Sequence, residues 1–212
     1  MNTESKVLIA IAAVITVAAS VLLVMAGGKD DDSKPVADPG KLVRSDSIQS
    51  NPKAKVTLVE FGDLQCSACA AANPTVQQVK KRYGAKINFV WRHFPLNIHR
   101  NALTAANASE AANAQGKFFA FADKLMATQS AWGEAGTPAA IQLFVSYGGN
   151  LGVSSPAIEK AVKEQQYKAK ISKDYADGEA LGVNSTPTFF LNGKKVETTE
   201  LLKAVAAAVS KK

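Results

Sequence analysis

The chain contains only two cysteines, Cys66 and Cys69, with Ser67 and Ala68 between them. Residues three apart on a helix share one face, so the two sulfurs are close enough to form a disulfide. A ring this short constrains the unfolded chain weakly and stores strain, so its disulfide is easily reduced and stabilises the fold little. A cysteine at the start of a helix also faces unpaired backbone amides, which lower its pKa. This spacing indicates thiol–disulfide exchange.

Two other uses of the cysteines compete with exchange. A zinc site would combine them with His93 and His99, but 23 residues and a whole predicted helix separate Cys69 from His93, where about 12 to 15 residues are typical. A purely structural disulfide is disfavoured because the ring is so short. With two cysteines in total, the chain excludes a multi-bridge disulfide scaffold and a four-cysteine zinc site. We assign no role to either histidine and expect neither a metal ion nor a cofactor.

A strand, a helix and a second strand are predicted around the cysteines. Residues 56–61 form a short apolar, β-branched run that predicts a buried strand. The cysteines follow, and an alanine-rich stretch then predicts a helix that ends near Tyr83, before Gly84. Residues 87–91 repeat the strand pattern. This order predicts a β-α-β unit with parallel strands.

Residues 101–181 contain no strand signal and predict a helical subdomain. Apolar residues recur there at helical spacing in two stripes, which are Phe118, Phe121, Leu125 and Met126, and then Ile141, Leu143, Phe144 and Tyr147. Gly148 and Gly149 are expected to close the helix of the second stripe. Ser155 and Pro156 are expected to open another helix as its N-cap and first residue. The block separates the β-α-β unit from the end of the chain.

The end of the chain returns to strands. Residues 188–191, the turn pair Asn192–Gly193 and residues 194–197 form the pattern of a tight β-hairpin. Thr198 then caps a last helix that runs to about Lys211. The predicted order of elements is strand, helix, strand, several helices, hairpin and helix, which is an α/β plan with a helical insertion.

The apolar run of residues 7–26 predicts a membrane anchor. Its 20 residues include only two polar side chains, Thr16 and Ser20, and as a helix they reach about 30 Å, the thickness of the bilayer core. The apolar core of a cleaved signal peptide is usually shorter, about 7 to 15 residues, so we expect an uncleaved transmembrane helix in residues 1–26, with a signal peptide as the alternative. Residues 27–41 are rich in glycine, proline and charge and are expected to be a flexible linker. Either kind of leader exports the remainder.

The chain is basic, with 25 Lys and Arg residues against 18 Asp and Glu residues and a net charge of +7. Such a charge raises the question of nucleic-acid binding. The lysines of residues 160–173 alternate with Glu159, Glu164 and Asp174, which is the pattern of a solvated helix face. Exported proteins also rarely meet nucleic acid. We therefore expect no nucleic-acid partner. We also expect a monomer.

Four features together resemble the thioredoxin superfamily. They are the strand of residues 56–61, the Cys-x-x-Cys motif at the next helix start, Pro74 eight residues after the first cysteine, and Thr186–Pro187 before the hairpin. The helical block and the leader narrow the resemblance to DsbA-like thiol–disulfide oxidoreductases, and most to the BdbD type. Residues 92–96 and 181–189 are also similar to recurrent segments of that family.

The resemblance covers about residues 43–209. It implies a thioredoxin fold with an inserted helical subdomain at about residues 101–181. This DsbA-like domain is expected to occupy residues 42–212 and to be preceded by the N-terminal transmembrane helix.

The resemblance also implies roles for five residues. Cys66 is the exposed sulfur that reacts with the partner protein, and Cys69 is the buried cysteine that resolves the mixed disulfide. Pro187 is cis and places the backbone of Thr186 beside the cysteines to pair with an extended substrate, although sequence alone also allows a trans bond. Glu60 occupies the strand position where relatives keep a buried acid, and burial raises the pKa of such a group and lets it relay a proton for Cys69. The alternative is that Glu60 faces solvent.

The implied activity is that of an extracytoplasmic oxidase that donates the Cys66–Cys69 disulfide to exported cysteine-containing proteins. A DsbB-like or VKOR-like membrane partner would reoxidise it. The dipeptide Ser67–Ala68 differs from the Pro-His of the strongest oxidants and from the Gly-Pro of thioredoxin, so the direction of exchange stays open. The alternatives are an envelope reductase or isomerase, and a non-enzymatic module that binds peptides at Thr186 and Pro187.

Overall fold

The computed structural model describes residues 38–211, so the predicted anchor in residues 1–26 lies outside the described residues. None of the helices within the described range is long and apolar enough to cross a membrane. Of the predicted linker only residues 38–41 are described. A single helical turn, α2 (Pro39–Leu42), begins there, and the composition of the linker does not predict it.

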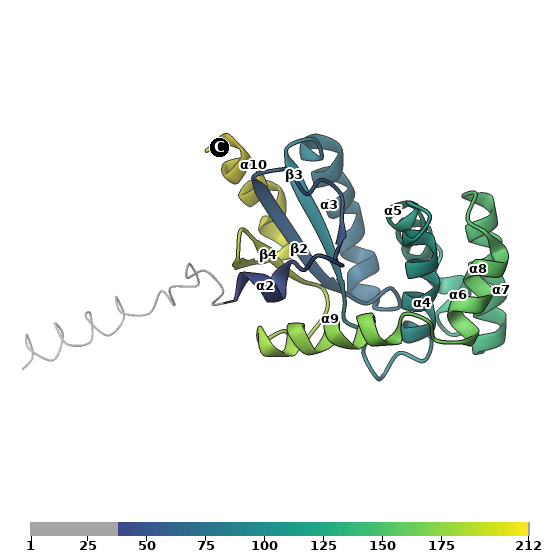
Figure 1. Ribbon diagram of the computed structural model, residues 1–212. Helices are drawn as coiled ribbons and strands as arrows, with labels where there is room; N and C mark the ends of the chain where they lie inside the picture. The colour runs from purple at the N-terminus through teal and green to yellow at the C-terminus, as the bar shows by residue number, and fades with distance from the viewer. Residues whose placement is uncertain (1–37, 212) are drawn as a thin grey trace, which may run out of the picture. The chain divides into compact units, whose positions relative to one another are not determined.

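A five-stranded sheet forms the centre of the domain (Figure 1). In chain order its strands are β1 (Ile48–Gln49), β2 (Val56–Gly62), β3 (Ile87–His93), β4 (Thr188–Leu191) and β5 (Lys194–Val196). They lie in the order β1-β3-β2-β4-β5, with β2 and β3 parallel and the other neighbours antiparallel. The predicted β-α-β unit and hairpin are therefore confirmed, whereas β1 is too short to leave a pattern in the sequence.

Helices cover the sheet and form the insertion (Figure 1). After α2 they are α3 (Ser67–Tyr83), α4 (Ala102–Asn113), α5 (Phe118–Ala127), α6 (Gln129–Trp132), α7 (Thr137–Asn150), α8 (Ser155–Lys163), α9 (Lys168–Ala180) and α10 (Leu201–Ser210). The cysteine helix α3 connects β2 to β3, and α4 to α9 occupy the predicted insertion. Thr198 does not cap the last helix as predicted, because it is the first residue of the 3₁₀ helix η1 (Thr198–Glu200), whose N-cap is Glu197 and which leads directly into α10.

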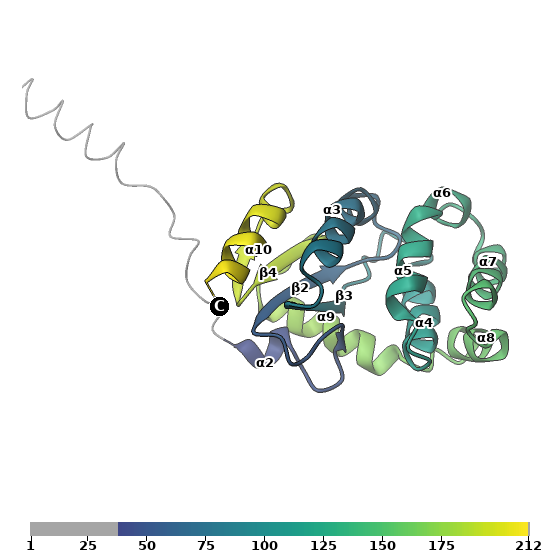
Figure 2. The ribbon, with the colours of Figure 1, turned by 90° about the horizontal axis from the view of Figure 1, so that it is seen from above.

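Different helices cover the two faces of the sheet, with α3 and α10 on one side of the strands and α9 on the other (Figure 2). Side chains alternate along β2. Leu58 packs with Val76 of α3 in the core between the sheet and α3 and α10. Val59 and Phe61 point the other way and pack in a separate cluster with Tyr175 of α9. The strand is therefore buried on both faces, as its continuous apolar run predicts.

The insertion has a core that continues into the cysteine loop. Phe121, Leu125 and Phe144, from the two predicted stripes, are fully buried in one cluster. The same cluster contains Cys66 and Cys69. The helical subdomain is thus packed directly against the cysteine pair rather than attached at a distance.

Two predicted helix ends are displaced by one or two residues. Helix α7 does not close at Gly148 and Gly149 but continues to Asn150, because Gly148 is buried where Ile158 of α8 packs against it. A Cβ at this position would lie 2.2 Å from Cδ1 of Ile158, so any larger residue would force the end of that side chain to move. The N-cap of α8 is Ser154 rather than Ser155, so that helix starts one position earlier than predicted.

A buried ion-pair cluster joins α9 to the sheet. Arg92 of β3 is fully buried, and its Nε and Nη2 each lie 2.7 Å from a carboxylate oxygen, of Asp174 and Asp177 respectively. Asp174 was expected on a solvated helix face, and this expectation is wrong because its side chain is fully buried against Arg92. Lys170 from the same run is also mostly enclosed, since its ammonium group binds Glu110 and Asp174.

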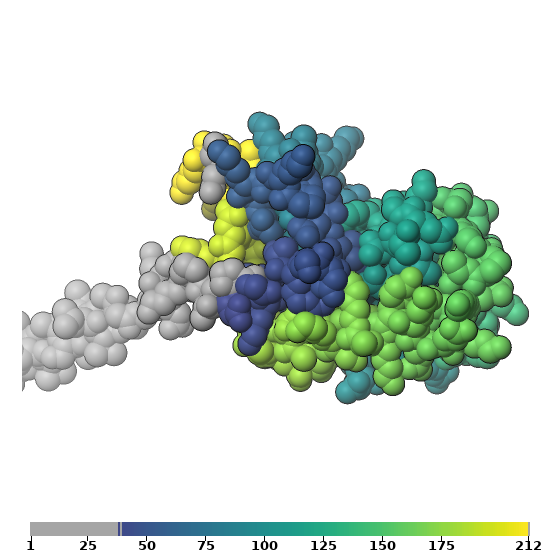
Figure 3. All heavy atoms as spheres, in the orientation of Figure 1, coloured from purple at the N-terminus to yellow at the C-terminus, as the bar shows by residue number. Residues whose placement is uncertain are grey.

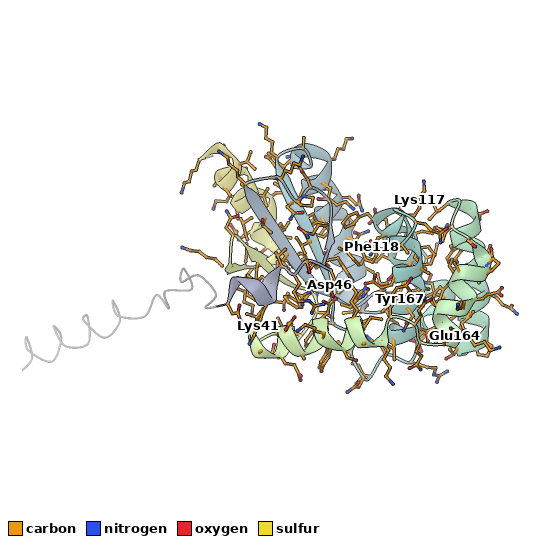
Figure 4. The ribbon with its side chains drawn as sticks, viewed as in Figure 1. Lys41, Asp46, Lys117, Phe118, Glu164 and Tyr167 are labelled. Atoms are coloured by element: carbon orange, nitrogen blue, oxygen red, sulfur yellow. The ribbon has the colours of Figure 1, made fainter. Side chains whose placement is uncertain are left out.

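The same cluster holds the start of the described chain. Arg92 Nη1 donates a hydrogen bond to the backbone oxygen of Leu42 (2.9 Å). Arg44 binds Asp177 through Nη1 (2.7 Å) and Asp46 through Nε (2.8 Å). In Figure 3 the dark purple residues that begin the described chain lie directly on the light-green α9, and Figure 4 labels Asp46 at this contact. The segment that follows the predicted linker is therefore fixed to the domain.

Candidate active site

Cys66 lies in the loop after β2, at the N-cap position of α3. Its backbone N–H donates to the oxygen of Asp63 (3.1 Å), and its thiol donates to the backbone oxygen of Thr186 (3.4 Å). Both cysteines are free thiols. Cys66 is 7% exposed and Cys69 is 0% exposed. Cys66 is thus the more accessible sulfur, but it is less exposed than the resemblance implies because the Thr186 loop lies against it.

Hydrogen bonds lower the pKa of Cys66 to about 5. The hydrogen bond from the Cys69 thiol contributes most, and burial opposes it. The Thr186 side chain and the backbone N–H groups of Cys69 and Ala68 lower the pKa further. These two amides are unpaired donors in the first turn of α3, as the position of the motif predicts. At neutral pH Cys66 is therefore a thiolate.

Cys69 shows the opposite behaviour. Burial raises its pKa well above the ordinary value, and the hydrogen bond to Cys66 and the charge of Glu60 add to this effect. The reduced pair therefore carries one negative charge, on Cys66, and one proton, on Cys69. A sulfur with a low pKa is a good leaving group and is mostly thiolate, whereas a thiol with a high pKa needs a base before it can attack.

The peptide bond between Thr186 and Pro187 is cis, which is the geometry that the resemblance implies. Thr186 is buried, and its backbone oxygen faces the Cys66 sulfur. Among the described residues, its hydroxyl is buried without a hydrogen-bond partner while Cys66 is a thiol. A Cys66 thiolate offers this hydroxyl an acceptor, which agrees with the lowering effect of Thr186 on the Cys66 pKa.

Glu60 is buried on β2, between Trp91 of β3 and Phe189 of β4. It is 2% exposed, so the alternative in which it faces solvent is wrong. Burial raises its pKa to about 8, Lys80 opposes this shift, and Asp123 adds to it. At neutral pH the carboxyl group therefore holds a proton that it can exchange with a nearby sulfur.

A small inlet, lined by Glu60, Lys80 and Asp123 among others, leads to this carboxyl group. Its volume is about 10 Å³, close to the smallest space that holds one water molecule. Lys80 Nζ of α3 lies 3.3 Å from Asp123 Oδ2 of α5, and it also lies over the Phe119 ring, 4.9 Å from the ring centre. A positive and a negative charge thus line the same inlet as Glu60.

Opposite shifts in the Glu60 pKa are expected when either charge is removed. Lys80→Met is expected to raise this pKa above about 8, because a favourable charge is lost, and Asp123→Asn to lower it, because a repulsive charge is lost. Carbon NMR of the Glu60 carboxyl group across a pH titration measures both shifts. Lys81→Met, at the next and exposed position of α3, is the matched control and is expected to leave the pKa in place. Shifts of the same sign in the two variants would contradict this account.

The two histidines belong to other networks. His93 is buried, and Trp91 Nε1 donates to its Nδ1 (3.1 Å), which leaves Nε2 to donate to Glu110 Oε1 (3.1 Å). His99 Nδ1 lies 2.6 Å from Asp63 Oδ2. Within residues 38–211 no three His, Cys, Asp or Glu side chains are grouped as a metal site requires. The structure does not bring the histidines together with the cysteines as zinc ligands.

Three charged residues near the site were not predicted. Asp63 is buried in the cysteine loop, where its carboxylate accepts the backbone N–H of Gln65 (2.8 Å) and of Leu96 (2.9 Å). Its place directly after a buried strand is the signal that could have identified it. Lys80 and Asp123 lie 43 positions apart on separate helices, and no local pattern connects them.

The chain belongs to a thioredoxin family, whose sequence model, described as thioredoxin, matches residues 44–211. This range contains the cysteine motif, the cis-proline loop and the whole helical insertion.

Solved structures place the fold among DsbA- and BdbD-like proteins. A thioredoxin-like oxidoreductase from Silicibacter pomeroyi DSS-3 is 27% identical with a TM-score of 0.66, over 82% of this chain and 99% of that one. BdbD from Bacillus subtilis is 19% identical with a TM-score of 0.67, over 77% of this chain and 93% of that one. The α-DsbA1 protein of Wolbachia pipientis is 20% identical with a TM-score of 0.68, over 80% and 94%. The predicted thioredoxin fold with its helical insertion is therefore confirmed.

Curated relatives carry this sequence as part of a longer protein. A Na⁺/H⁺ antiporter NhaA 1 of Mycobacterium sp. strain KMS is 36% identical over 155 residues, which are 71% of this chain and 24% of that protein. A protein of the same name from Salinispora arenicola is 33% identical over 193 residues, 91% of this chain and 28% of that protein. The chain thus spans about a quarter of the length of these relatives.

Proposed function

We propose that the protein is an extracytoplasmic thiol–disulfide oxidoreductase whose reacting group is the Cys66–Cys69 pair. The observation that carries this proposal is the opposed chemistry of the two sulfurs, a thiolate at Cys66 and a buried thiol at Cys69, beside the cis-proline loop. The family and the fold support it. A merely structural pair would not require one sulfur to be activated.

The direction of exchange is that of an oxidase. A low pKa at Cys66 stabilises the reduced form and so favours passing the disulfide to a substrate. The Cys66 pKa of about 5 lies between the values of about 7 for thioredoxin and about 3.5 for DsbA. An equilibrium with glutathione tests this step, since a potential near that of thioredoxin would indicate a reductase or isomerase.

Exchange proceeds in two steps that conserve electrons. A substrate thiolate attacks Cys66 Sγ of the oxidised pair, the Cys66–Cys69 bond breaks, and Cys69 leaves as a thiolate that takes a proton from Glu60. A second substrate thiolate then attacks the substrate sulfur of the mixed disulfide and releases Cys66 as its stable thiolate. The substrate gains a disulfide, and its two electrons remain on the Cys66–Cys69 dithiol.

The proposed setting is the outer side of a membrane. The apolar run of residues 7–26 supports a tether, and the relatives named as antiporters are membrane proteins that carry a similar sequence. The substrates are exported cysteine-containing proteins, and a DsbB-like or VKOR-like membrane protein reoxidises the dithiol. The domain acts as a monomer and without nucleic acid.

Trapping of the intermediate tests the proposal. The Cys66 thiolate of Cys69→Ser can attack the disulfide of an oxidised substrate, but the variant lacks the sulfur that resolves the mixed disulfide in this reverse direction. Substrates are therefore expected to stay covalently attached to Cys66 and to be released by a reductant. Non-reducing electrophoresis and mass spectrometry of the purified variant identify them. Cys66→Ser is the matched control and is expected to trap nothing. If the Cys69→Ser variant also recovers no mixed disulfide, the proposed mechanism is wrong.

A further inference from the structure

A polar recess of about 280 Å³ lies beside the reacting cysteine. Gln65 and Ser67, the two residues that flank Cys66, both line it, together with Gln129 of α6 and Glu134 of the turn that follows α6. The volume is slightly below the range of about 300–1,000 Å³ for small-molecule pockets, so the recess suits one side chain rather than a cofactor. Neither the proposed chemistry nor the cis-proline loop uses it.

The recess is built on the same loop as the catalytic sulfur. Gln129 Nε2 donates to the backbone oxygens of Leu64 (3.0 Å) and Cys66 (3.1 Å). The Cys66 sulfur contacts Thr186, whereas its backbone oxygen faces Gln129. Because Gln65 and Ser67 flank Cys66 in the chain, a polypeptide bonded to the Cys66 sulfur lies next to residues that line the recess.

Buried hydrogen bonds fix the walls of the recess in place. Gln65 Nε2 donates to Gly133 O (2.7 Å), and Gln65 Oε1 accepts the backbone N–H of Asn101 (2.6 Å). Asn101 Nδ2 in turn donates to the backbone oxygens of Trp132 (3.1 Å) and Ala135 (3.0 Å). These contacts tie the turn after α6 to the cysteine loop, so the recess is formed before any substrate binds, which lowers the ordering cost of binding.

The lining of the recess favours a positive charge. It contains amides, hydroxyls, one imidazole and the carboxylate of Glu134. None of the described Lys or Arg residues lines the recess, although the chain has 25 Lys and Arg residues against 18 Asp and Glu residues. The imidazole, of His99, is itself bound to the buried carboxylate of Asp63 (2.6 Å). A basic side chain entering the recess meets the carboxylate of Glu134, whereas an acidic one meets like charge.

We propose that this recess is a substrate subsite that takes a Lys or Arg side chain close to the reacting cysteine of the polypeptide, with Glu134 as its ionic partner. The inference rests on the proposed function, because it assigns a substrate preference to the same exchange reaction. It makes Glu134 a specificity-determining residue that has no part in the chemistry of the sulfurs.

Exchange rates with charged peptides test the subsite. Extended single-cysteine peptides that differ only in Arg or Glu beside the cysteine are reacted with the oxidised full-length protein, and each rate is divided by that of uncharged dithiothreitol. The Arg-to-Glu rate ratio is then compared between protein variants, so the intrinsic reactivity of each peptide cancels. Glu134→Gln is expected to lower the ratio about 1.5- to 5-fold, the range for an exposed ion pair, and Glu134→Lys to lower it further.

Glu164→Lys is the matched control, because Glu164 is an exposed acid of the same insertion at the end of α8, outside the recess. It makes the same change in net charge and is expected to leave the ratio unchanged. If the Arg-to-Glu rate ratio of Glu134→Lys equals that of the unmodified protein, the proposed subsite is wrong. The proposed exchange reaction is unaffected by that result. Failure of the unmodified protein to react with any peptide contradicts the proposed function instead.

Discussion

Replacement of Arg92 by Met is expected to lower the free energy of unfolding by about 3–5 kcal/mol, the usual cost of removing one partner from a buried ion pair. Asp174 is fully buried and Asp177 mostly so, and both lose a hydrogen-bonded guanidinium at 2.7 Å. Arg44 Nη2 remains 3.2 Å from Asp174, so it compensates in part and places the effect nearer the lower end of the range. The variant also releases the backbone oxygen of Leu42, and so loosens the start of the domain.

Urea denaturation followed by circular dichroism measures this loss. Lys173→Met is the matched control, because Lys173 also pairs with Asp177, at 3.8 Å, but is 61% exposed. Such a pair contributes about 0–1 kcal/mol. Adding Asp174→Asn to Arg92→Met removes one of the two buried charges that lose the guanidinium, so the double variant is expected to be more stable than the sum of the single losses implies. Equal effects of the Arg92 and Lys173 variants would contradict the buried cluster.

The parts of the fold that sequence predicts are those with local signals. The β2 run and the cysteine motif lie in one short stretch, and the stripes through Phe121 and Phe144 repeat at helical spacing. Glu60 could be predicted because its place in an apolar strand and the family resemblance agree on burial. The short elements α2 and β1 have too few residues to form a period.

The misplaced residues are charged groups whose partners are far away in sequence. Asp174 pairs with Arg92, 82 positions earlier, and Lys170 binds Glu110, 60 positions earlier. The charges on α9 alternate in the same way whether that face of the helix is exposed to water or packs against other charged groups. Periodicity alone therefore does not distinguish a solvated face from a buried ion-pair cluster. The recess beside Cys66 was missed for a similar reason, since Gln129 reaches the cysteine loop from 63 positions away.

The reduced protein is expected to gain stability over the oxidised protein as the pH rises from about 5 to about 8.5. The pKa of Cys66 is about 5 in the folded dithiol and about 8.5 in an unfolded chain. A lowered pKa in the folded state stabilises it most above the unfolded pKa, and this contribution is lost as the pH falls through about 5. The oxidised protein has no thiol at this position. The difference in unfolding free energy between the two forms therefore rises by up to about 1.4 kcal/mol per pH unit within this window.

The two other titrating groups of the site, Cys69 and Glu60, act outside this pH range or in both redox forms of the protein. The pKa of Cys69 is raised in the folded state, so its thiol opposes folding of the reduced form only above about pH 8.5, where the unfolded chain ionises. Glu60, whose pKa is raised chiefly by burial, titrates in both redox forms, so the difference between them removes the part of its contribution that burial causes. The smaller part that the Cys66 charge causes remains in the reduced form. Urea denaturation of the two forms at several pH values measures how their difference in unfolding free energy changes with pH. Thr186→Val is expected to raise the pKa of Cys66 in the folded protein, so the pH range over which this difference rises becomes narrower. A difference that stays constant between pH 5.5 and 8 would show that Cys66 is not stabilised as a thiolate, and would remove the main argument for an oxidase.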